Sequence, residues 1–232
     1  MAGSAHAAAV PSLLDPRQQW GLLNLSQAGR YLRIAKRTFH RWARGYPHGR
    51  PLLHVREPDG DHLPVTFVSL TEAHVLDGLR EAGVRPDKIR PALDVLAREF
   101  GHEYVLIAPE LATDGVEVLW DFSRSRAGSG LIVAESGQHV FREIVDDYLY
   151  YVHRDDHGAP EVLELRHWHP AKVIVDVRRS FGQPIFATSG VRVADVAGML
   201  KAGDDAEIVA DEFGIGIEDV RTAARLLLGR AT

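Results

Sequence analysis

The side chains best suited to bind a charged ligand gather in one stretch of the chain. Between Pro16 and Arg56 there are nine arginine and lysine residues and no aspartate or glutamate, although the whole chain has 27 basic and 32 acidic residues and a formal net charge of −5. The rest of the chain, with 18 basic against 32 acidic residues, therefore sums to −14. A cationic surface on an otherwise anionic protein attracts a polyanion, most commonly nucleic acid, to one face. A solvated basic surface without a ligand is the alternative.

Eight residues of this basic stretch are candidate contacts to DNA. Arginine can pair with a phosphate or bind guanine through two hydrogen bonds in the major groove, and lysine, histidine and threonine can donate to phosphates or base edges. The candidates are Arg33, Lys36, Arg37, Thr38, His40, Arg41, Arg44 and Arg56.

A helix-turn-helix is predicted to position these candidates. Ser26 would cap a first helix, whose inward residues are Ala28, Gly29 and Leu32, and a turn at residues 33–35 would follow. Arg33 stands in this turn where many such motifs have glycine. Phe39 and Trp42, three residues apart, would pack a second helix on the same small core, and Gly45 would end it. The other positions of the second helix then face outward, and a helix fits the major groove.

The segment after this motif predicts a wing. Two runs of β-forming residues flank Pro58, Asp59 and Gly60, which are typical of a turn between strands. Such a hairpin would lie beside the second helix and bring Arg56 to the sugar-phosphate backbone, although a purely structural hairpin is equally consistent with the pattern. Helices from Thr71 to about residue 82 and from Pro86 to about residue 100 would complete the domain.

The middle of the chain predicts a small mixed sheet. EYVLIAPEL from Glu103 and VEVLWDF from Val116 have the composition of a strand pair, residues 138–151 have helical spacing, and VLELRHW and KVIVDV predict further strands. Four histidines raise the alternative of a metal site, but their spacing matches no tight metal motif and no carboxylate has a fixed register with them. No metal or other cofactor is therefore expected. These residues are His153, His157, His167 and His169.

The last forty residues predict a second helical corner of opposite charge. A helix is expected over residues 193–202, and Ala210, Gly214 and Val220 then supply the small residue, the sharp turn and the core residue of a helix-turn-helix. Seven acidic residues and no basic residue lie between Asp204 and Asp219. A phosphate backbone would be repelled there, so this corner is expected to bind protein, either a second copy or a basic partner.

Residues of about Val173 to Leu228 resemble the antitoxin-associated domain of unknown function 433. The resemblance is carried by a strand, by a Phe-Gly-x-Pro segment at residues 178–184, by residues 189–193, by a Lys-x-Gly turn at residues 201–203 and by the acidic helix pair. Ser-Gly-Val-Arg at residues 189–192 replaces the usual Gly-Thr-Arg. With the basic stretch and the sheet, the chain from about Leu23 onward resembles the longer VapB-type antitoxins of bacterial VapBC modules.

The resemblance implies a DNA-binding antitoxin that represses its own operon and neutralises a toxin with a PIN-like ribonuclease fold. A homodimer on double-stranded operator DNA is expected, because one helix-turn-helix reads only a few base pairs. The alternative is a stand-alone MerR-like winged helix regulator that senses a small effector. No enzyme is expected, because the sequence contains no Gly-rich phosphate loop, nucleophile elbow or metalloprotease motif.

The expected fold class is α+β. Residues 1–22 would form a flexible arm, residues 23–101 a winged helix-turn-helix domain, residues 102–170 a small α/β domain and residues 171–232 an all-helical antitoxin-type domain. No apolar run approaches the roughly 18 residues that a membrane span requires, so no membrane partner is expected. The absence of cysteine fits the reducing cytoplasm, which is the expected compartment.

Overall fold

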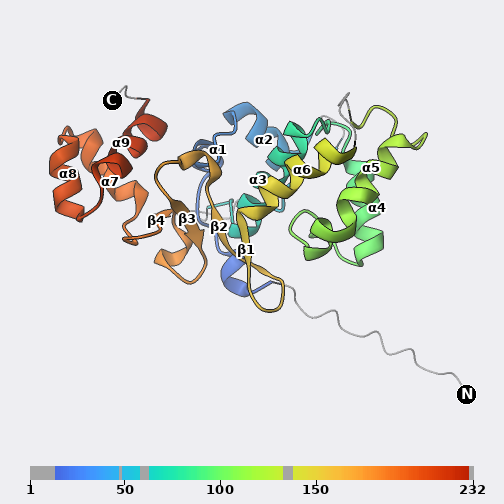
Figure 1. The fold of residues 1–232 in the computed structure, drawn as a ribbon, viewed down its shortest axis with the longest axis horizontal. Coiled ribbons are helices and arrows are strands. Elements are labelled where there is room, and N and C mark those ends of the chain that lie inside the picture. Colours follow the sequence, from blue (N-terminus) through green and yellow to red (C-terminus); the bar gives the residue numbers. More distant parts are fainter. Residues whose placement is uncertain (1–13, 47–48, 58–62, 133–137, 230–232) are drawn as a thin grey trace, which may run out of the picture.

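The computed structural model of the protein describes residues 14–46, 49–57, 63–132 and 138–229. It confirms an α+β fold, in which helices surround a four-stranded sheet (Figure 1). The helices are α1 (Leu25–Tyr31), α2 (Lys36–Arg44), α3 (Phe67–Glu81), α4 (Arg90–Phe100), α5 (Val116–Arg124), α6 (Gln138–Tyr150), α7 (Val193–Ala202), α8 (Ala206–Phe213) and α9 (Ile217–Ala223). Short helical turns are η1 (Pro16–Gln19), η2 (Leu111–Gly115), η3 (Arg166–Trp168), η4 (Ser180–Gly182) and η5 (Ala224–Leu228).

The sheet is antiparallel throughout and follows chain order. Strands β1 (Val152–Arg154), β2 (Pro160–Glu164), β3 (Val173–Asp176) and β4 (Ile185–Phe186) pair with their sequence neighbours. All four residues of β3 are buried, as befits a central strand covered on both faces. In Figure 1 the sheet lies between α7–α9 at one end of the molecule and the remaining helices. It therefore joins the two regions that carry the helical corners.

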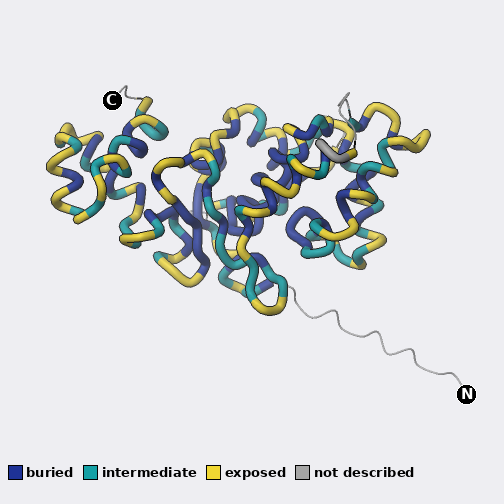
Figure 2. Tube along the Cα trace, viewed as in Figure 1, coloured by how far each residue is buried: buried dark blue, intermediate teal, exposed yellow. Residues whose placement is uncertain are grey.

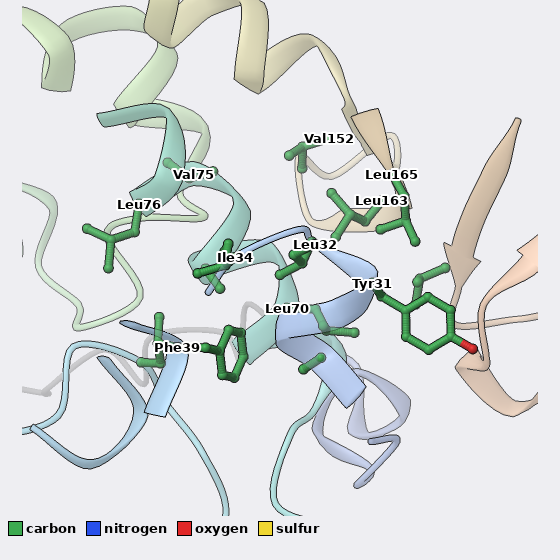
Figure 3. Close-up of a cluster of buried hydrophobic side chains, with 14 of the residues drawn as sticks. Tyr31, Leu32, Ile34, Phe39, Leu70, Val75, Leu76, Val152, Leu163 and Leu165 are labelled. Atoms are coloured by element: carbon green, nitrogen blue, oxygen red, sulfur yellow. The ribbon is translucent and has the colours of Figure 1, made fainter. Parts of the chain in front are cut away.

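Helix α3 is the centre of the larger half of the molecule. Thirteen of its fifteen residues are buried, and Figure 2 shows this region as dark blue. Leu70, Val75 and Leu76 of α3 share one apolar cluster with residues of α1, α2 and the sheet, including Phe39 and Leu163 (Figure 3). Burial at about 25 cal/mol per Å² of apolar surface makes such a cluster the main stabilising contribution. The helical corner at α1 and α2 is thus built on the common core.

Two side-chain anchors fasten the sheet region to the first helical corner. The Trp168 Nε1–H donates to the carbonyl oxygen of Tyr31 at 3.0 Å, and the two rings stack with centroids 5.8 Å apart. The Gln183 amide nitrogen donates to the carbonyl oxygen of Leu22 at 2.8 Å. These contacts join positions more than 130 residues apart, so the orientation of α1 depends on the distant part of the chain.

The strand pair predicted at residues 103–122 is wrong. Residues 105–108 are buried without pairing as a ladder, and the chain then forms η2 and α5. Val116 and Leu119 are buried while Glu117 is exposed, which is helical spacing. The cause is tertiary packing, because α5 lies against α4 and α6, where the Trp120 and Phe141 rings are 5.7 Å apart. The helices at 138–150 and 193–202 and the strand at 173–176 agree with prediction. The strand predicted at 162–168 lies instead at 160–164, and residues 166–168 form η3.

The described residues of the predicted wing do not form a β-hairpin ladder. Its turn at residues 58–60 lies outside them, and the flanking segments share one backbone hydrogen bond, from the Arg56 N–H to the Pro64 carbonyl oxygen at 2.8 Å. The second β-forming run does not continue as a strand. Thr66 caps α3 through Ser69, so the helix begins at Phe67 rather than at Thr71. The capping hydrogen bonds and complete burial favour the helix over the strand propensity of this run.

Two domain borders also differ from expectation. The flexible arm was expected to reach residue 22, but η1 is capped by Asp15 and Gln18 is buried, with its side-chain nitrogen bonded to the Pro160 carbonyl oxygen. The border expected between residues 170 and 171 falls inside the sheet, because β2 pairs with β3. Helix α6 also packs on α3. Residues 102–170 are therefore part of a common core. Among the described residues, no helix is long and apolar enough to cross a bilayer.

Candidate nucleic-acid interface

The first helix and the turn are built from local signals. Asn24 caps α1 by accepting a hydrogen bond from the Gln27 N–H at 2.8 Å. The predicted cap, Ser26, is wrong, because it lies two residues further on, inside the first turn of the helix. Arg33 adopts a left-handed conformation with φ of +60°, and the Ile34 N–H bonds to the Gly29 carbonyl oxygen at 2.8 Å. A Cβ atom on Gly29 would lie 3.3 Å from the Phe39 Cβ. A small residue at this position therefore allows α1 and α2 to approach closely.

The second helix packs as predicted. Phe39 and Trp42 are both 0% exposed, and the helix ends at Gly45, which has φ of +90°. The Leu52 N–H then bonds to the Trp42 carbonyl oxygen at 2.8 Å, so the chain that leaves α2 is tied to its end. These buried residues fix which side of α2 faces the core. The opposite side is available to a ligand.

The amino end of α2 has no side-chain cap, a feature that it shares with α4, α5, α7, α8 and α9. Asn24 and Thr66 cap α1 and α3 with side-chain hydrogen bonds, whereas Ala35 precedes α2 and provides none. The first turn also carries Lys36 and Arg37, whose positive charges oppose the helix dipole. Free N–H groups and positive charge at a helix amino end form a binding site for phosphate. An anion would therefore offset an arrangement that is unfavourable in the free protein.

Most of the predicted contact residues are exposed to solvent. Those that the structure places as exposed are Arg33, Lys36, Arg37, Arg41, Arg44 and Arg56. Thr38 is half-buried in the first turn of α2. The Arg41 guanidinium lies 5.4 Å from the centre of the Tyr46 ring, a cation–π contact that restricts its direction. The spacing of Arg37, Arg41 and Arg44 at three and four residues places them along one strip of α2.

His40 is less available than the pattern suggested. It is half-buried, and its Nε2 atom is covered without a hydrogen-bond partner in the described part of the chain. Burial lowers the pKa of His40, and the neighbouring charges of Arg44 and Lys36 lower it further. The imidazole is therefore neutral at pH 7 and contributes no positive charge to the interface.

The cations of the basic stretch differ from those elsewhere in their partners. Arg17 pairs with Asp15, but within the residues that the structure describes none of the other eight forms an ion pair with a carboxylate. Elsewhere such pairs are common, as between Arg142 and Glu117 at 3.2 Å and between Lys172 and Glu164 at 3.0 Å. Unpaired cations repel one another at the cost of stability unless an external anion binds. Their collection around α2 is the main electrostatic feature of the site.

Two further cations also form no ion pair within the described residues, and the prediction from sequence did not include them. Arg30 is exposed on α1, and Arg50 is exposed in the segment that follows α2. Both belong to the basic stretch, which was the available signal. They lie outside the second helix and the wing, which are the elements that the prediction covers. Helix-turn-helix proteins also use the first helix against the DNA backbone.

The carboxyl-terminal corner has the expected shape and charge. Gly214 has φ of +60° between α8 and α9, and Val220 is 0% exposed. Glu207, Asp211 and Glu212 are exposed on α8. Arg221 is neutralised by Glu218 at 2.9 Å and Glu207 at 3.5 Å. The surface of α8 is therefore a poor match for a phosphate backbone.

The four histidines considered for a metal do not meet in a cluster. Among the described residues, no three histidine, aspartate or glutamate side chains are placed to share an ion. His153 Nε2 instead lies 3.6 Å from Glu164 Oε2 on the adjacent strand. His74, which the sequence did not single out, is the deeply buried histidine of the α3 core.

Replacing Arg33 with glycine is expected to separate stability from DNA binding. The left-handed conformation costs a residue other than glycine about 1–2 kcal/mol. Glycine removes this strain, but its greater conformational freedom in the unfolded chain offsets about 0.5–1 kcal/mol of the gain. Arg33→Gly should therefore raise the free energy of unfolding by about 0.5–1 kcal/mol, measured by urea denaturation, while it weakens DNA binding. Arg33→Ala should weaken DNA binding without the gain in stability.

Ser180→Gly provides the matched control for this prediction. Ser180 also has positive φ, of +46°, but lies in η4 outside the basic stretch. We expect it to gain stability with unchanged DNA binding. A loss of stability in Arg33→Gly would contradict the prediction. It would show that contacts of the arginine side chain contribute more to the free energy of unfolding than the strain of its backbone conformation costs.

The comparisons with known proteins agree with this geometry. A family model described as "Putative DNA-binding HTH domain" matches residues 21–93, and one described as "Protein of unknown function (DUF433)" matches residues 173–225. The crystal structure of Rv2018 from Mycobacterium tuberculosis superposes with a TM-score of 0.72 at 38% identity, covering 88% of this chain and 97% of that one. "Putative antitoxin VapB45" of Mycobacterium tuberculosis (strain ATCC 25618 / H37Rv) is 41% identical over 228 residues, which cover 90% of this chain and 95% of the relative. The chain therefore belongs to the VapB45 antitoxin family.

Proposed function

We propose that this protein is a DNA-binding antitoxin that represses its own operon. The observation that carries the DNA-binding half is a set of eight cations around α2 that form no ion pair within the described residues, on a chain of net charge −5. Their charge attracts the phosphate backbone, and the strip of Arg37, Arg41 and Arg44 has the chemistry to contact bases in the major groove. The relatedness to an antitoxin supports a regulatory role rather than catalysis.

The protein acts as a homodimer in this proposal. A single helix-turn-helix contacts too few base pairs for useful specificity, and two half-sites about 34 Å apart bring two recognition helices onto one side of the duplex. Each protomer contributes α2 to one half-site. The expected operator is accordingly an inverted repeat in front of the protein's own gene.

The second half of the proposal is that the protein neutralises a toxin with a PIN-like ribonuclease fold. It is supported by the name of the VapB45 relative and by the match of residues 173–225 to the DUF433 family. The acidic surface of α8, which is unsuited to DNA, is available to a protein partner.

Co-expression with the neighbouring reading frame tests this proposal. We expect the neighbour to arrest growth when it is expressed alone, to be harmless with this protein and to co-purify with it. Operator binding is measured separately, by titrating the purified protein into a labelled duplex from upstream of the gene. A neighbour that is harmless alone and does not co-purify would refute the antitoxin half, whatever the result with DNA.

A small-effector regulator remains the second candidate because of one hollow near α2. It has a volume of about 300 Å³, at the small end for ligand sites, and is lined by Arg50, His54, Glu72 and Arg90 among others. The Nε atom of Arg90 is buried there without a hydrogen-bond partner in the described residues. Under this candidate, operator binding by the purified protein would change with a small anion while the neighbouring frame would have no toxicity.

A further inference from the structure

A second cationic feature lies where the carboxyl-terminal helices meet α1. Helix α1 packs against η5, and a hollow of about 90 Å³ lies between α1 and α7. Its exposed lining residues are Gln27 and Arg30 from α1, and Ala194 and Lys201 from the first and last turns of α7. Buried Tyr31 and Ala197 also line it. The hollow therefore combines two exposed cations and one amide group with a lining of buried side chains.

The two cations have no carboxylate that neutralises them. In the described part of the chain, neither Arg30 nor Lys201 forms an ion pair. Asp195 is the carboxylate close enough to interact with Tyr31 beside the hollow. It forms an ion pair with Arg192 at 2.8 Å. Lys201 and Arg225 are the exposed basic residues of the segment from α7 to η5, whose other exposed charges are acidic. Two unpaired cations at one small hollow favour an anion of the size of a phosphate group.

The position of the hollow relative to α2 decides which phosphate it fits. Figure 1 shows α1 between α2 on one side and α7 and α9 on the other, along one edge of the molecule. When the second helix of a helix-turn-helix lies in the major groove, the first helix crosses the sugar-phosphate backbone. A duplex bound by α2 would therefore bring its backbone to α1, whose Arg30 lines the hollow together with Lys201.

We propose that Arg30 and Lys201 hold one backbone phosphate of the operator, so that the antitoxin-type domain takes part in DNA binding. This inference rests on the proposed DNA-binding function. It assigns a role to Lys201, which lies some 140 positions from the basic stretch, and it explains why the acidic domain is docked beside α1. The contact positions the protein on the duplex and reads no sequence.

The salt dependence of DNA binding tests the proposal. The probe is a labelled duplex from upstream of the gene, bound to the full-length protein at several salt concentrations. Lys201→Gln should reduce the steepness of log affinity against log salt by about 0.9 and weaken binding about five- to tenfold at 0.1 M salt. Lys201→Arg should retain the wild-type slope. Arg30→Gln should have an effect similar to that of Lys201→Gln.

Lys172→Gln is the matched control, because it removes the same charge from a lysine that pairs with Glu164 on the sheet. We expect this variant to keep the wild-type slope. A wild-type slope in Lys201→Gln, with normal binding by the unaltered protein, would overturn this inference and leave the proposed function standing. Absence of salt-dependent binding by the unaltered protein would instead refute the DNA-binding function itself.

Discussion

Simultaneous replacement of Arg37 and Arg41 with alanine is expected to weaken operator binding by about 1–3 kcal/mol for each arginine that contacts a base edge. Both side chains are exposed on α2 and have no carboxylate partner among the described residues. If either contacts a phosphate instead, the salt slope should fall by about 1 for that residue. Fluorescence anisotropy with the operator duplex at several salt concentrations measures both effects. Alanine favours helix, so α2 should remain folded.

The control for this double variant removes two arginines from elsewhere. Arg98 on α4 and Arg126 after α5 are also exposed, and their replacement with alanine changes the net charge by the same amount. We expect the control to bind as the unaltered protein does. Unchanged affinity and salt slope in Arg37→Ala/Arg41→Ala would show that α2 does not bind the operator. An equal loss of operator affinity in the control would show that the effect comes from the change in net charge rather than from the position of the two arginines.

The first helical corner could be predicted because its signals are local. Phe39 and Trp42 have helical spacing and Gly45 ends the second helix, so the inward face of this helix follows from the sequence alone. The outward face follows from the inward one. The same reasoning succeeded at the second corner, where Gly214 and Val220 mark the turn and the core.

The first turn of α3 and the whole of α5 could not be predicted in the same way because their environment determines them. Helix α3 is buried on nearly all sides, so it lacks the alternation of apolar and polar residues that reveals a surface helix. Short apolar runs such as those at residues 105–108 and 116–120 fit either a strand or a buried helix. Their state depends on α4 and α6, which the local sequence does not specify.

The candidate site shows the same limit at the level of side chains. The cluster of cations is visible in the sequence, but the half-buried state of His40 depends on packing. The approach of Lys201 to Arg30 depends on the docking of the carboxyl-terminal helices on α1. No local pattern connects residues so far apart in the chain. Composition thus indicates the kind of ligand, and the fold determines which side chains can meet it.

Acidification from pH 7 to about 4.5 is expected to destabilise the protein through His74. This residue is 4% exposed on α3, and its Nε2–H donates to the Tyr148 carbonyl oxygen at 2.9 Å. Burial lowers the pKa of His74 to about 4, with smaller contributions from the charges of His167 and Arg166, whereas the ordinary value is 6.5. The unfolded chain therefore binds a proton below about pH 6.5 that the folded protein accepts only near pH 4.

The sign of this effect follows from the difference in bound protons. Because the unfolded state binds more protons between these two pKa values, the free energy of unfolding falls as the pH falls. The stability present above about pH 6.5 should decrease by about 2–3 kcal/mol by pH 4.5, since each unit of pKa difference corresponds to about 1.4 kcal/mol. Asp77 opposes this trend, because burial raises the pKa of its carboxyl group. A variant at His74 is therefore needed to separate its contribution to the pH dependence from that of Asp77.

His74→Gln provides this variant, because the amide nitrogen of glutamine can replace the Nε2–H donor and does not titrate. Urea denaturation of both proteins between pH 7 and 4.5 should show the unaltered protein losing about 2–3 kcal/mol more than His74→Gln. His157→Gln, which changes an exposed histidine in the loop between β1 and β2, should follow the unaltered protein. Parallel pH profiles for the unaltered protein and His74→Gln would mean that His74 is solvated or charged in the folded state. The packing of α3 against α6 would then be looser than a core in which His74 stays neutral because water is excluded.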